Sequence, residues 1–261
     1  ATMTDAEHRA VIKFACEQVK GRIPVIAGTG SNETAYAIQL SQYAESVGAD
    51  ALLVVTPYYN KCTQNGLVAH YTAIADSVNI PLILYDVPSR TGVGIQTETY
   101  VKLAQHPNIA AVKEANGDLS KILRLRAACG DSLDVYSGND DQIVPILSLG
   151  GKGVISTFSN IMPKEMHELA TASVAGDLKT AQTLTFKYLD LMNALFMDVN
   201  PIPVKQALNL MGFNCGHCRL PLVDMSDEQI AKLGTIMTEE EQAKAKFSKS
   251  VTDITDVVST M

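Results

Sequence analysis

Short runs of apolar residues alternate with stretches in which apolar residues recur every three or four positions. A short continuous run bounded by turn residues is typical of a strand buried on both faces, whereas the three-to-four spacing is typical of an amphipathic helix. The pattern predicts six strands, at residues 23–28, 51–55, 81–85, 109–113, 133–136 and 153–156. Because helical patterns such as 34–47 and 67–78 separate these strands, we expect a parallel sheet with helices on its faces.

The strand pattern stops after Gly176, and helical patterns follow at 178–196, 202–211 and 227–246. We therefore predict two regions: an α/β region at 1–176 and a helical appendage at 177–261. The α/β region has the rhythm of a TIM (β/α)8 barrel, but such a barrel closes with eight strands and the pattern supplies six. The chain also begins with a helical pattern. We expect a truncated barrel whose first and last strands form open edges.

Composition narrows the classes of partner. The chain has 261 residues, 46% of them hydrophobic and 19% charged, with a net charge of −7. An acidic chain is a poor partner for nucleic acid or an anionic membrane, because both bind basic surfaces. No apolar run approaches the roughly 20 residues of a membrane span, and residues 1–5 lead directly into a helical pattern instead of a signal peptide. Five scattered cysteines suggest reduced thiols and a cytoplasmic setting.

Lys113 closes the apolar run at 109–113, so it lies at the carboxyl end of a predicted buried strand. That end of a strand is where catalytic side chains collect in strand–helix barrels. Apolar surroundings disfavour an ammonium ion, and a neutral amine can attack a carbonyl to form a Schiff base. The alternative is a solvated lysine at a strand end, which is the commoner case for one lysine taken alone.

Two neighbouring strand ends supply further polar groups. Tyr85 ends the strand at 81–85 and precedes a segment rich in turn residues, which we expect to be a loop and not a helix; Arg90 lies within it. Tyr59 follows the strand at 51–55. A phenol can transfer protons, and the planar guanidinium of arginine matches a carboxylate. Each residue alone is more often a packing tyrosine or a solvated arginine, but together with Lys113 they suit imine chemistry on small keto acids.

Five segments resemble the dihydrodipicolinate synthase (4-hydroxy-tetrahydrodipicolinate synthase) family, which belongs with N-acetylneuraminate lyase among the pyruvate-dependent class I aldolases. They are TPYYN at 56–60, YDVPSRTG at 85–92, VKEANG at 112–117, SGND at 137–140 and NPIPVK at 200–205. The resemblance runs from about residue 1 to about residue 245. The arginine in the loop at 85–92 favours the synthase over the sialic acid lyase, whose loop lacks it.

The resemblance implies a role for each matching residue. Lys113 forms an imine with pyruvate, Tyr85 relays protons, and Arg90 holds the carboxylate of aspartate semialdehyde. Tyr59 matches a tyrosine that each subunit lends to its neighbour, while Gly138 and Ile155 match positions that line the pyruvate pocket. The implied activity is a condensation in lysine biosynthesis that needs no metal and no cofactor beyond the covalent lysine–pyruvate imine.

The sequence also departs from that family. Its members carry a strand, a helix, a second strand and a GTTGE loop before the position of Ala1, and that loop supplies donors for the pyruvate carboxylate. We expect this difference to impair synthase activity, and we expect the open edges to favour a homodimer or another homo-oligomer. Two alternatives remain: a non-catalytic barrel remnant that self-associates, or a related aldolase that acts on another aldehyde, such as a sugar acid.

Two other motifs have simpler explanations. The segment GTGSNET at 28–34 follows a strand and opens a helix, but it lacks the lysine and the full glycine spacing of phosphate-binding loops. We interpret it as a helix start capped by Ser31 or Asn32. The segment CGHC at 215–218 has the spacing of redox or zinc motifs, but no strand precedes it and no second cysteine pair exists. We do not expect a metal there.

Overall fold

The computed structural model describes residues 2–237. Its contacts divide these residues into two units, one comprising 3–155 and the other comprising Thr2 with the residues from Ser156 onward. The division predicted at Gly176 lies inside the second unit, between α8 (Pro163–Val174) and α9 (Leu178–Ala194). Each unit is described separately below.

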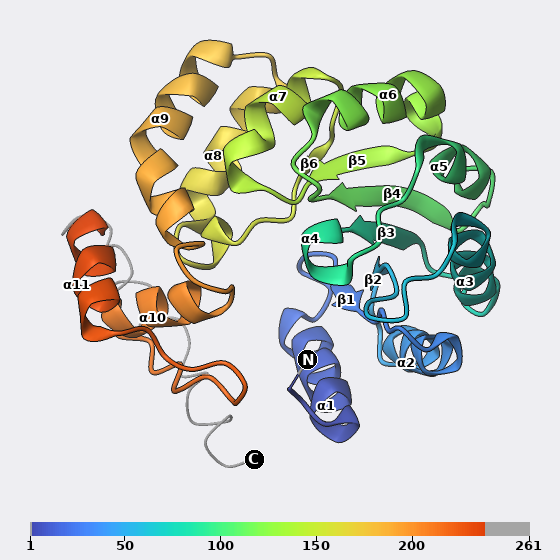
Figure 1. Ribbon diagram of the computed structural model, residues 1–261, viewed down its shortest axis with the longest axis horizontal. Coiled ribbons are helices and arrows are strands. Elements are labelled where there is room, and N and C mark those ends of the chain that lie inside the picture. Colours follow the sequence, from blue (N-terminus) through green and yellow to red (C-terminus); the bar gives the residue numbers. More distant parts are fainter. Residues whose placement is uncertain (1, 238–261) are drawn as a thin grey trace. The chain divides into compact units, whose positions relative to one another are not determined.

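The first unit is built on one parallel sheet with the strand order β1-β2-β3-β4-β5-β6 (Figure 1). All six predicted strands are present, with ends that differ by up to three residues from the prediction. Sequential order and parallel pairing mean that each strand joins the next by a helical crossover. The strands are β1 (Ile26–Gly28), β2 (Ala51–Val55), β3 (Leu82–Asp86), β4 (Ile109–Glu114), β5 (Asp134–Ser137) and β6 (Gly153–Val154).

Helices follow one another around the outside of this sheet (Figure 1). Apolar side chains from the strands, such as Leu52, Leu84 and Val112, are fully buried, which gives the sheet its continuous hydrophobic runs. The helices and short turns of the unit are α1 (Asp5–Val19), α2 (Thr34–Ser46), α3 (Gln64–Asp76), α4 (Pro88–Thr91), α5 (Thr97–Leu103), α6 (Leu119–Cys129), η1 (Gly130–Ser132), η2 (Asp140–Gln142) and α7 (Ile143–Ser148).

The start of α2 differs from the prediction. Glu33, and not Ser31 or Asn32, caps the helix, and its carboxylate accepts hydrogen bonds from the backbone N–H groups of Ala35 and Tyr36. The two expected capping residues have other partners. Ser31 Oγ accepts from the N–H of Glu33 at 3.2 Å, and the Asn32 amide donates to the carbonyl of Tyr58 at 3.1 Å. The loop therefore uses these side chains to fix its own shape.

The segment after β3 also differs from the prediction of a loop without helix. Residues Pro88–Thr91 form the single turn α4, which begins with proline at its first position, where the missing N–H costs nothing. Gly92 ends the turn in the left-handed region at φ 73°, and its N–H donates to the carbonyl of Pro88 at 2.9 Å. Arg90 thus lies on an ordered turn directly after β3.

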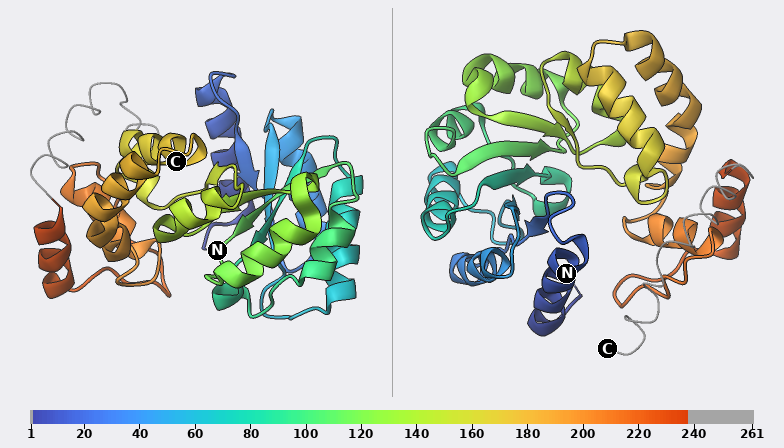
Figure 2. Two further views of the ribbon diagram at one scale, coloured as in Figure 1. Left: turned by 90° about the horizontal axis from the view of Figure 1, so that it is seen from above. Right: turned by 180° about the vertical axis from the view of Figure 1, so that it is seen from behind.

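The second unit is helical, as predicted for the C-terminal part of the chain. α8 packs against α9, and α11 (Asp227–Ile236) packs against both α9 and α10 (Ile202–Leu210) (Figure 2). The short turn η3 (Phe158–Asn160) places Phe158 against Tyr188 of α9, with ring centroids 5.5 Å apart. Part of the helix predicted at 227–246 lies outside the described residues. None of the described helices is both long and apolar enough to cross a bilayer.

Candidate active site

Four adjacent strands bring one residue each to the same level at the carboxyl end of the sheet. In the β-ladder, Val55 pairs with Tyr85, Tyr85 with Lys113, and Lys113 with Tyr136. Residues at the same level of neighbouring parallel strands project to the same face, so their side chains lie side by side. The register therefore brings together Tyr85 and Lys113, two of the three catalytic residues predicted from the sequence.

The Lys113 ammonium lies over the Tyr85 ring, with Nζ 4.3 Å from the ring centroid. Burial lowers the pKa of Lys113 from 10.5 to about 8, because desolvation disfavours its charged form; Asp140 opposes this lowering and Arg90 adds to it. Burial also raises the pKa of the Tyr85 phenol, against the smaller effect of Arg90. At neutral pH the site thus holds a protonated phenol beside an amine that is readily deprotonated.

A pocket of about 340 Å³ lies over β1, β2 and β3, and Tyr85 lines it. Its walls are mostly apolar, and Tyr85 and Arg90 bring polar groups to it. Residues lining it include Gly28, Val55, Tyr58, Tyr85, Arg90 and Thr91. Its volume lies within the range of small-molecule sites, and an apolar pocket with a few convergent polar groups is the usual form of such a site.

Hydrogen bonds fix the turn that carries Arg90. Thr56, fully buried at the end of β2, donates from Oγ1 to Thr91 Oγ1 at 3.0 Å. Thr91 in turn donates to the carbonyl of Val93 at 2.9 Å. Sequence reasoning assigned no role to either threonine. The available signal was that Thr56 directly follows β2 and that Thr91 directly follows Arg90, a residue predicted to bind substrate.

Gly138 lies where no side chain would fit. A Cβ at this position would lie 2.6 Å from the Ala115 Cβ and 3.1 Å from the Cε of Lys113. The N–H of Gly138 donates to the carbonyl of Glu114 at 2.7 Å, which holds the chain after β5 against the end of β4. Gly138 therefore allows the backbone to approach the lysine closely.

Asp140 and Ile155 complete the neighbourhood of the sheet end. Asp140 is buried, with 3% of its surface exposed, and its charge favours the ammonium form of Lys113. Asp140 lies in the segment SGND at 137–140, but nothing in the sequence pattern marked it as a residue that acts on Lys113. The N–H of Ile155 donates to the carbonyl of Ser137 at 2.8 Å, so the backbone continues the β5–β6 pairing by one residue.

Tyr59 lies apart from this group. Its side chain is 91% exposed and its backbone has φ 70°, an uncommon conformation for a residue other than glycine. Neighbouring side chains hold the loop in place, since the Asn60 amide donates to the carbonyl of Asn32 at 2.8 Å and the Asn32 amide donates to that of Tyr58. Within one chain, Tyr59 is therefore an exposed aromatic side chain that does not line the pocket.

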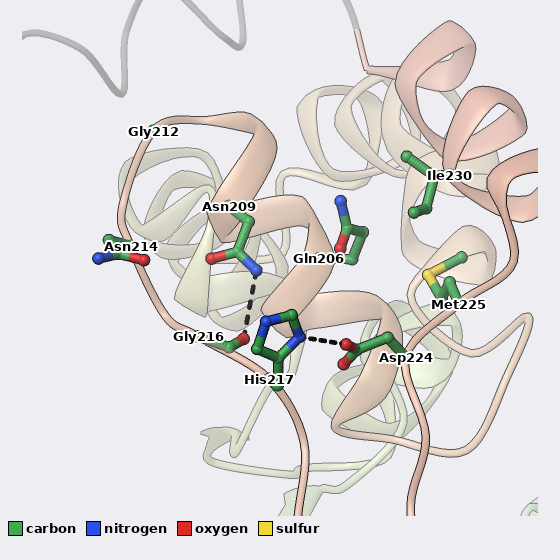
Figure 3. A pocket seen from close by; sticks show the side chains of 9 residues that line it. All are labelled: Gln206, Asn209, Gly212, Asn214, Gly216, His217, Asp224, Met225 and Ile230. Atoms are coloured by element: carbon green, nitrogen blue, oxygen red, sulfur yellow. Dashed lines mark hydrogen bonds and ion pairs between the residues drawn. The ribbon is translucent and has the colours of Figure 1, made fainter.

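The second unit contains another pocket, of about 550 Å³, beside the CGHC motif (Figure 3). His217 pairs with Asp224, and the Asn209 side chain binds the loop backbone at both Cys215 and Gly216. Burial raises the pKa of the Cys215 thiol, which makes its thiolate harder to form. Within residues 2–237, no three or more His, Cys, Asp or Glu side chains are arranged to bind a metal. Polar contacts of this motif shape its loop.

The family model described as "Dihydrodipicolinate synthetase family" matches residues 1–240. The chain belongs to this family. The 4-hydroxy-tetrahydrodipicolinate synthase of Thermoanaerobacter sp. (strain X514) is 54% identical over 239 residues, covering 91% of this chain and 80% of the relative. The synthase of Clostridium perfringens (strain SM101 / Type A) is 54% identical over 233 residues, covering 89% of this chain and 80% of the relative.

Solved structures of dihydrodipicolinate synthases share the fold. The Aquifex aeolicus enzyme matches with a TM-score of 0.90 at 44% identity, over 92% of this chain and 83% of that one. The Acinetobacter baumannii enzyme, described as chloride-inhibited and complexed with pyruvate, matches with a TM-score of 0.89 at 44% identity, over 93% and 82% of the two chains. The predicted resemblance to this family and its barrel fold is therefore confirmed.

Proposed function

We propose that this chain is a Schiff-base aldolase that condenses pyruvate with aspartate semialdehyde. The observation that carries the proposal is the position of Lys113, buried over the Tyr85 ring with its pKa lowered to about 8. A lysine that loses its proton near neutral pH is a competent nucleophile toward a ketone. The names of relatives that share about half of its residues support the same reaction and its place in lysine biosynthesis.

In the proposed mechanism, the neutral Lys113 Nζ attacks the ketone carbon of pyruvate and forms a carbinolamine. Loss of water gives the imine, and removal of a proton from the methyl carbon gives the enamine. The enamine carbon then forms a bond to the aldehyde carbon, whose oxygen takes up a proton. Attack by the amino group of the condensed substrate on the imine frees Lys113 and closes the ring of the product. This sequence needs no cofactor other than the covalent imine.

The neighbouring residues supply proton transfer and binding. Tyr85, whose phenol stays protonated because burial raises its pKa, relays protons during imine formation and carbon–carbon bond formation. Arg90, at the pocket, offers two N–H donors to the carboxylate of the aldehyde substrate. Gly138 and Ile155 lie at the carboxyl end of the sheet, where pyruvate would bind.

We further propose that the chain works as a homodimer or larger homo-oligomer in which Tyr59 enters the site of a neighbouring chain. A tyrosine that is 91% exposed on a loop held by Asn32 and Asn60 is well suited to contact a second copy. Sedimentation of the protein and of a Tyr59→Ala variant, each at micromolar concentration, tests this. A stable monomer in both samples contradicts it.

The decisive experiment traps the imine. The protein is incubated with pyruvate, reduced with borohydride, digested and analysed by mass spectrometry. We expect a reduced pyruvyl adduct on Lys113, and none in a Lys113→Arg variant, which keeps the charge but not an accessible neutral amine. A Lys152→Arg variant controls for the substitution, since Lys152 is a half-exposed lysine in an ion pair with Asp134.

An unmodified Lys113 in the folded parent protein refutes the proposed aldolase and supports the non-catalytic remnant instead. Where trapping succeeds, assays with aspartate semialdehyde and with sugar aldehydes separate the synthase from a related aldolase. Arg90 favours the first, because a guanidinium selects an aldehyde that carries a carboxylate near its reacting end.

A further inference from the structure

Behind the two reactive residues lies a second buried group of polar side chains. Asp86 and Glu114 directly follow Tyr85 and Lys113 and pair with each other in the β3–β4 ladder. Since successive residues of a strand point to opposite faces, their carboxyl groups project to the opposite side of the sheet from Tyr85 and Lys113. Both are buried, with 0% and 1% of their surface exposed.

The ammonium group of Lys121 contacts both carboxyl groups. Lys121 of α6 places its Nζ 2.5 Å from Asp86 Oδ2 and 3.8 Å from Glu114 Oε1. Burial and the charge of Asp86 raise the pKa of Glu114 to about 8, so Glu114 is mostly protonated near pH 7. Lys121 then forms its closer ion pair with Asp86. The Tyr100 hydroxyl of α5 donates to Glu114 Oε1 at 2.8 Å. We call Asp86, Tyr100, Glu114 and Lys121 the Asp86 network.

The Asp86 network is joined to the segment that follows Arg90. Asp86 Oδ1 accepts the N–H of Ile95 at 3.2 Å, four residues beyond Thr91, the last residue of the turn that carries Arg90. Gln64 holds the residues on either side of Ile95, donating to the carbonyl of Gly94 at 2.9 Å and accepting from the N–H of Gln96 at 3.0 Å. The Asp86 carboxylate therefore links the end of β3 to the segment that follows Arg90.

The backbone of the two network residues also supports the neighbouring strand ends. The carbonyl of Asp86 accepts the N–H of Ala115 at 2.9 Å, and the carbonyl of Glu114 accepts the N–H of Gly138 at 2.7 Å. The mechanism above uses none of the four network side chains. Asp86 and Glu114 nevertheless directly follow Tyr85 and Lys113, and the Asp86 carboxylate accepts the N–H of Ile95 in the segment after Arg90.

We propose that the Lys121–Asp86 ion pair, with Glu114 and Tyr100, positions Lys113, Tyr85 and Arg90 for imine formation and carboxylate binding. The catalytic side of this inference rests on the proposed function. The structural part of the inference does not rest on the proposed function, because it concerns where the Lys113 amine lies and how well it is desolvated. An ion pair fixes one strand end and one helix with a geometry that an apolar contact does not impose.

The test compares variants of equal net charge. Lys121→Arg keeps the ion pair. The double variant Asp86→Asn with Lys121→Met removes one negative and one positive charge together, which avoids leaving a lone buried carboxylate as Lys121→Met alone would. The double variant Asp134→Asn with Lys152→Met is the matched control, since it removes both charges of a more exposed lysine–aspartate pair at 3.9 Å. Thermal unfolding and circular dichroism establish that each variant is folded.

Two measurements report on the position of Lys113 and not on the stability of the protein. The first is the rate of pyruvate trapping, which we expect to fall about a hundredfold in the double variant, as misplacement by about 1 Å can cause. The second is the pKa of Lys113, measured without pyruvate from the pH dependence of its acetylation by mass spectrometry. Because the double variant adds no net charge, a rise of this pKa toward 10.5 reports greater hydration of the amine.

We expect Lys121→Arg and the double control variant Asp134→Asn with Lys152→Met to match the parent protein in both readouts. The proposal is overturned if the double variant folds and Lys113 keeps the pKa that it has in the parent protein. Where the parent protein is trapped by pyruvate, the same outcome also requires that the double variant keeps the parent trapping rate. If this double variant does not fold, Asp86→Asn with Lys121→Gln, which also leaves the net charge unchanged, is used in its place, and the same criterion applies. A parent protein that is not trapped at all refutes the aldolase, and the acetylation pKa alone then decides the positioning role.

Discussion

Lys113 Nζ lies 4.3 Å from the centroid of the Tyr85 ring, and the two residues pair in register on β4 and β3. The face of an aromatic ring attracts a cation and by itself favours the ammonium form. Desolvation is the larger effect here, because the pKa of Lys113 is lowered to about 8 in spite of the ring and of Asp140. The pair thus combines an amine that loses its proton near pH 8 with a phenol whose pKa is raised.

Replacing Lys113 by methionine should make the protein more stable at neutral pH. A folded-state pKa below the unfolded value means that the buried ammonium costs stability below about pH 8, and that this cost disappears as pH rises toward 10.5. We expect Lys113→Met to raise the free energy of unfolding by about 1–3 kcal/mol at pH 7. Urea unfolding at pH 7 and pH 10 measures the difference, which should shrink at the higher pH. Lys152→Met is the control and should change stability little.

Arg90 should affect both the acidity of Lys113 and the binding of the aldehyde. Its positive charge lowers the pKa of Lys113 and of Tyr85. We expect Arg90→Ala to move the midpoint of the pH profile for pyruvate trapping upward and to raise the KM for the aldehyde. Arg90→Lys keeps the charge but not the planar fork, so its midpoint should stay near that of the parent while KM still rises. An Arg90→Ala profile that coincides with the parent profile argues against this electrostatic effect.

Asp140 should act in the opposite direction to Arg90. Its carboxylate favours the Lys113 ammonium, so Asp140→Asn should lower the pKa of Lys113 further. Trapping at pH 7 should then become faster relative to trapping at pH 9. Asp141→Asn changes an exposed neighbour by the same chemistry and serves as the control. A midpoint that does not move in Asp140→Asn, in a variant shown to be folded, contradicts this assignment.

Gly138→Ala should damage both packing and trapping. The new methyl group would meet the Ala115 Cβ at 2.6 Å, the carbonyl oxygen of Glu114 at 3.0 Å and the Cε of Lys113 at 3.1 Å. Overpacking of this kind costs about 1–3 kcal/mol of stability, and relief of the contact displaces Lys113. Thermal unfolding and the trapping rate are the measurements. Gly234→Ala, in α11 with its nearest contact at 3.9 Å, should be tolerated or stabilising.

Glu114 should make stability depend on pH above the range where most carboxyl groups titrate. Its folded-state pKa of about 8 exceeds the usual value of 4.5, so the folded protein binds a proton that the unfolded chain releases. Stability is therefore lost as pH rises from about 4.5 to about 8. The side chain in Glu114→Gln stays neutral, so this variant should lose less stability than the parent as pH rises. The free energy of unfolding of the variant minus that of the parent, measured in urea titrations, should therefore increase over this range. A constant difference contradicts the raised pKa.

The sequence by itself determined most of the sheet. All six strands were predicted because parallel strands buried on both faces require continuous apolar runs, and such runs need no knowledge of distant residues. The same logic located Lys113 and Tyr85 at strand ends. Specific motifs then identified the family, although the start of α2 and the turn α4 were predicted wrongly. In both places, local hydrogen bonds and a preorganised proline decided the structure.

Only the tertiary structure decided which residues meet. The register that sets Tyr85 beside Lys113 depends on how two strands far apart in the sequence align, and no local pattern encodes that alignment. The same holds for Asp140, which acts on Lys113 through space, and for Lys121, which comes from α6 to neutralise Asp86. A lysine becomes a nucleophile because of the burial and the charges around it, and these exist only once the chain has folded.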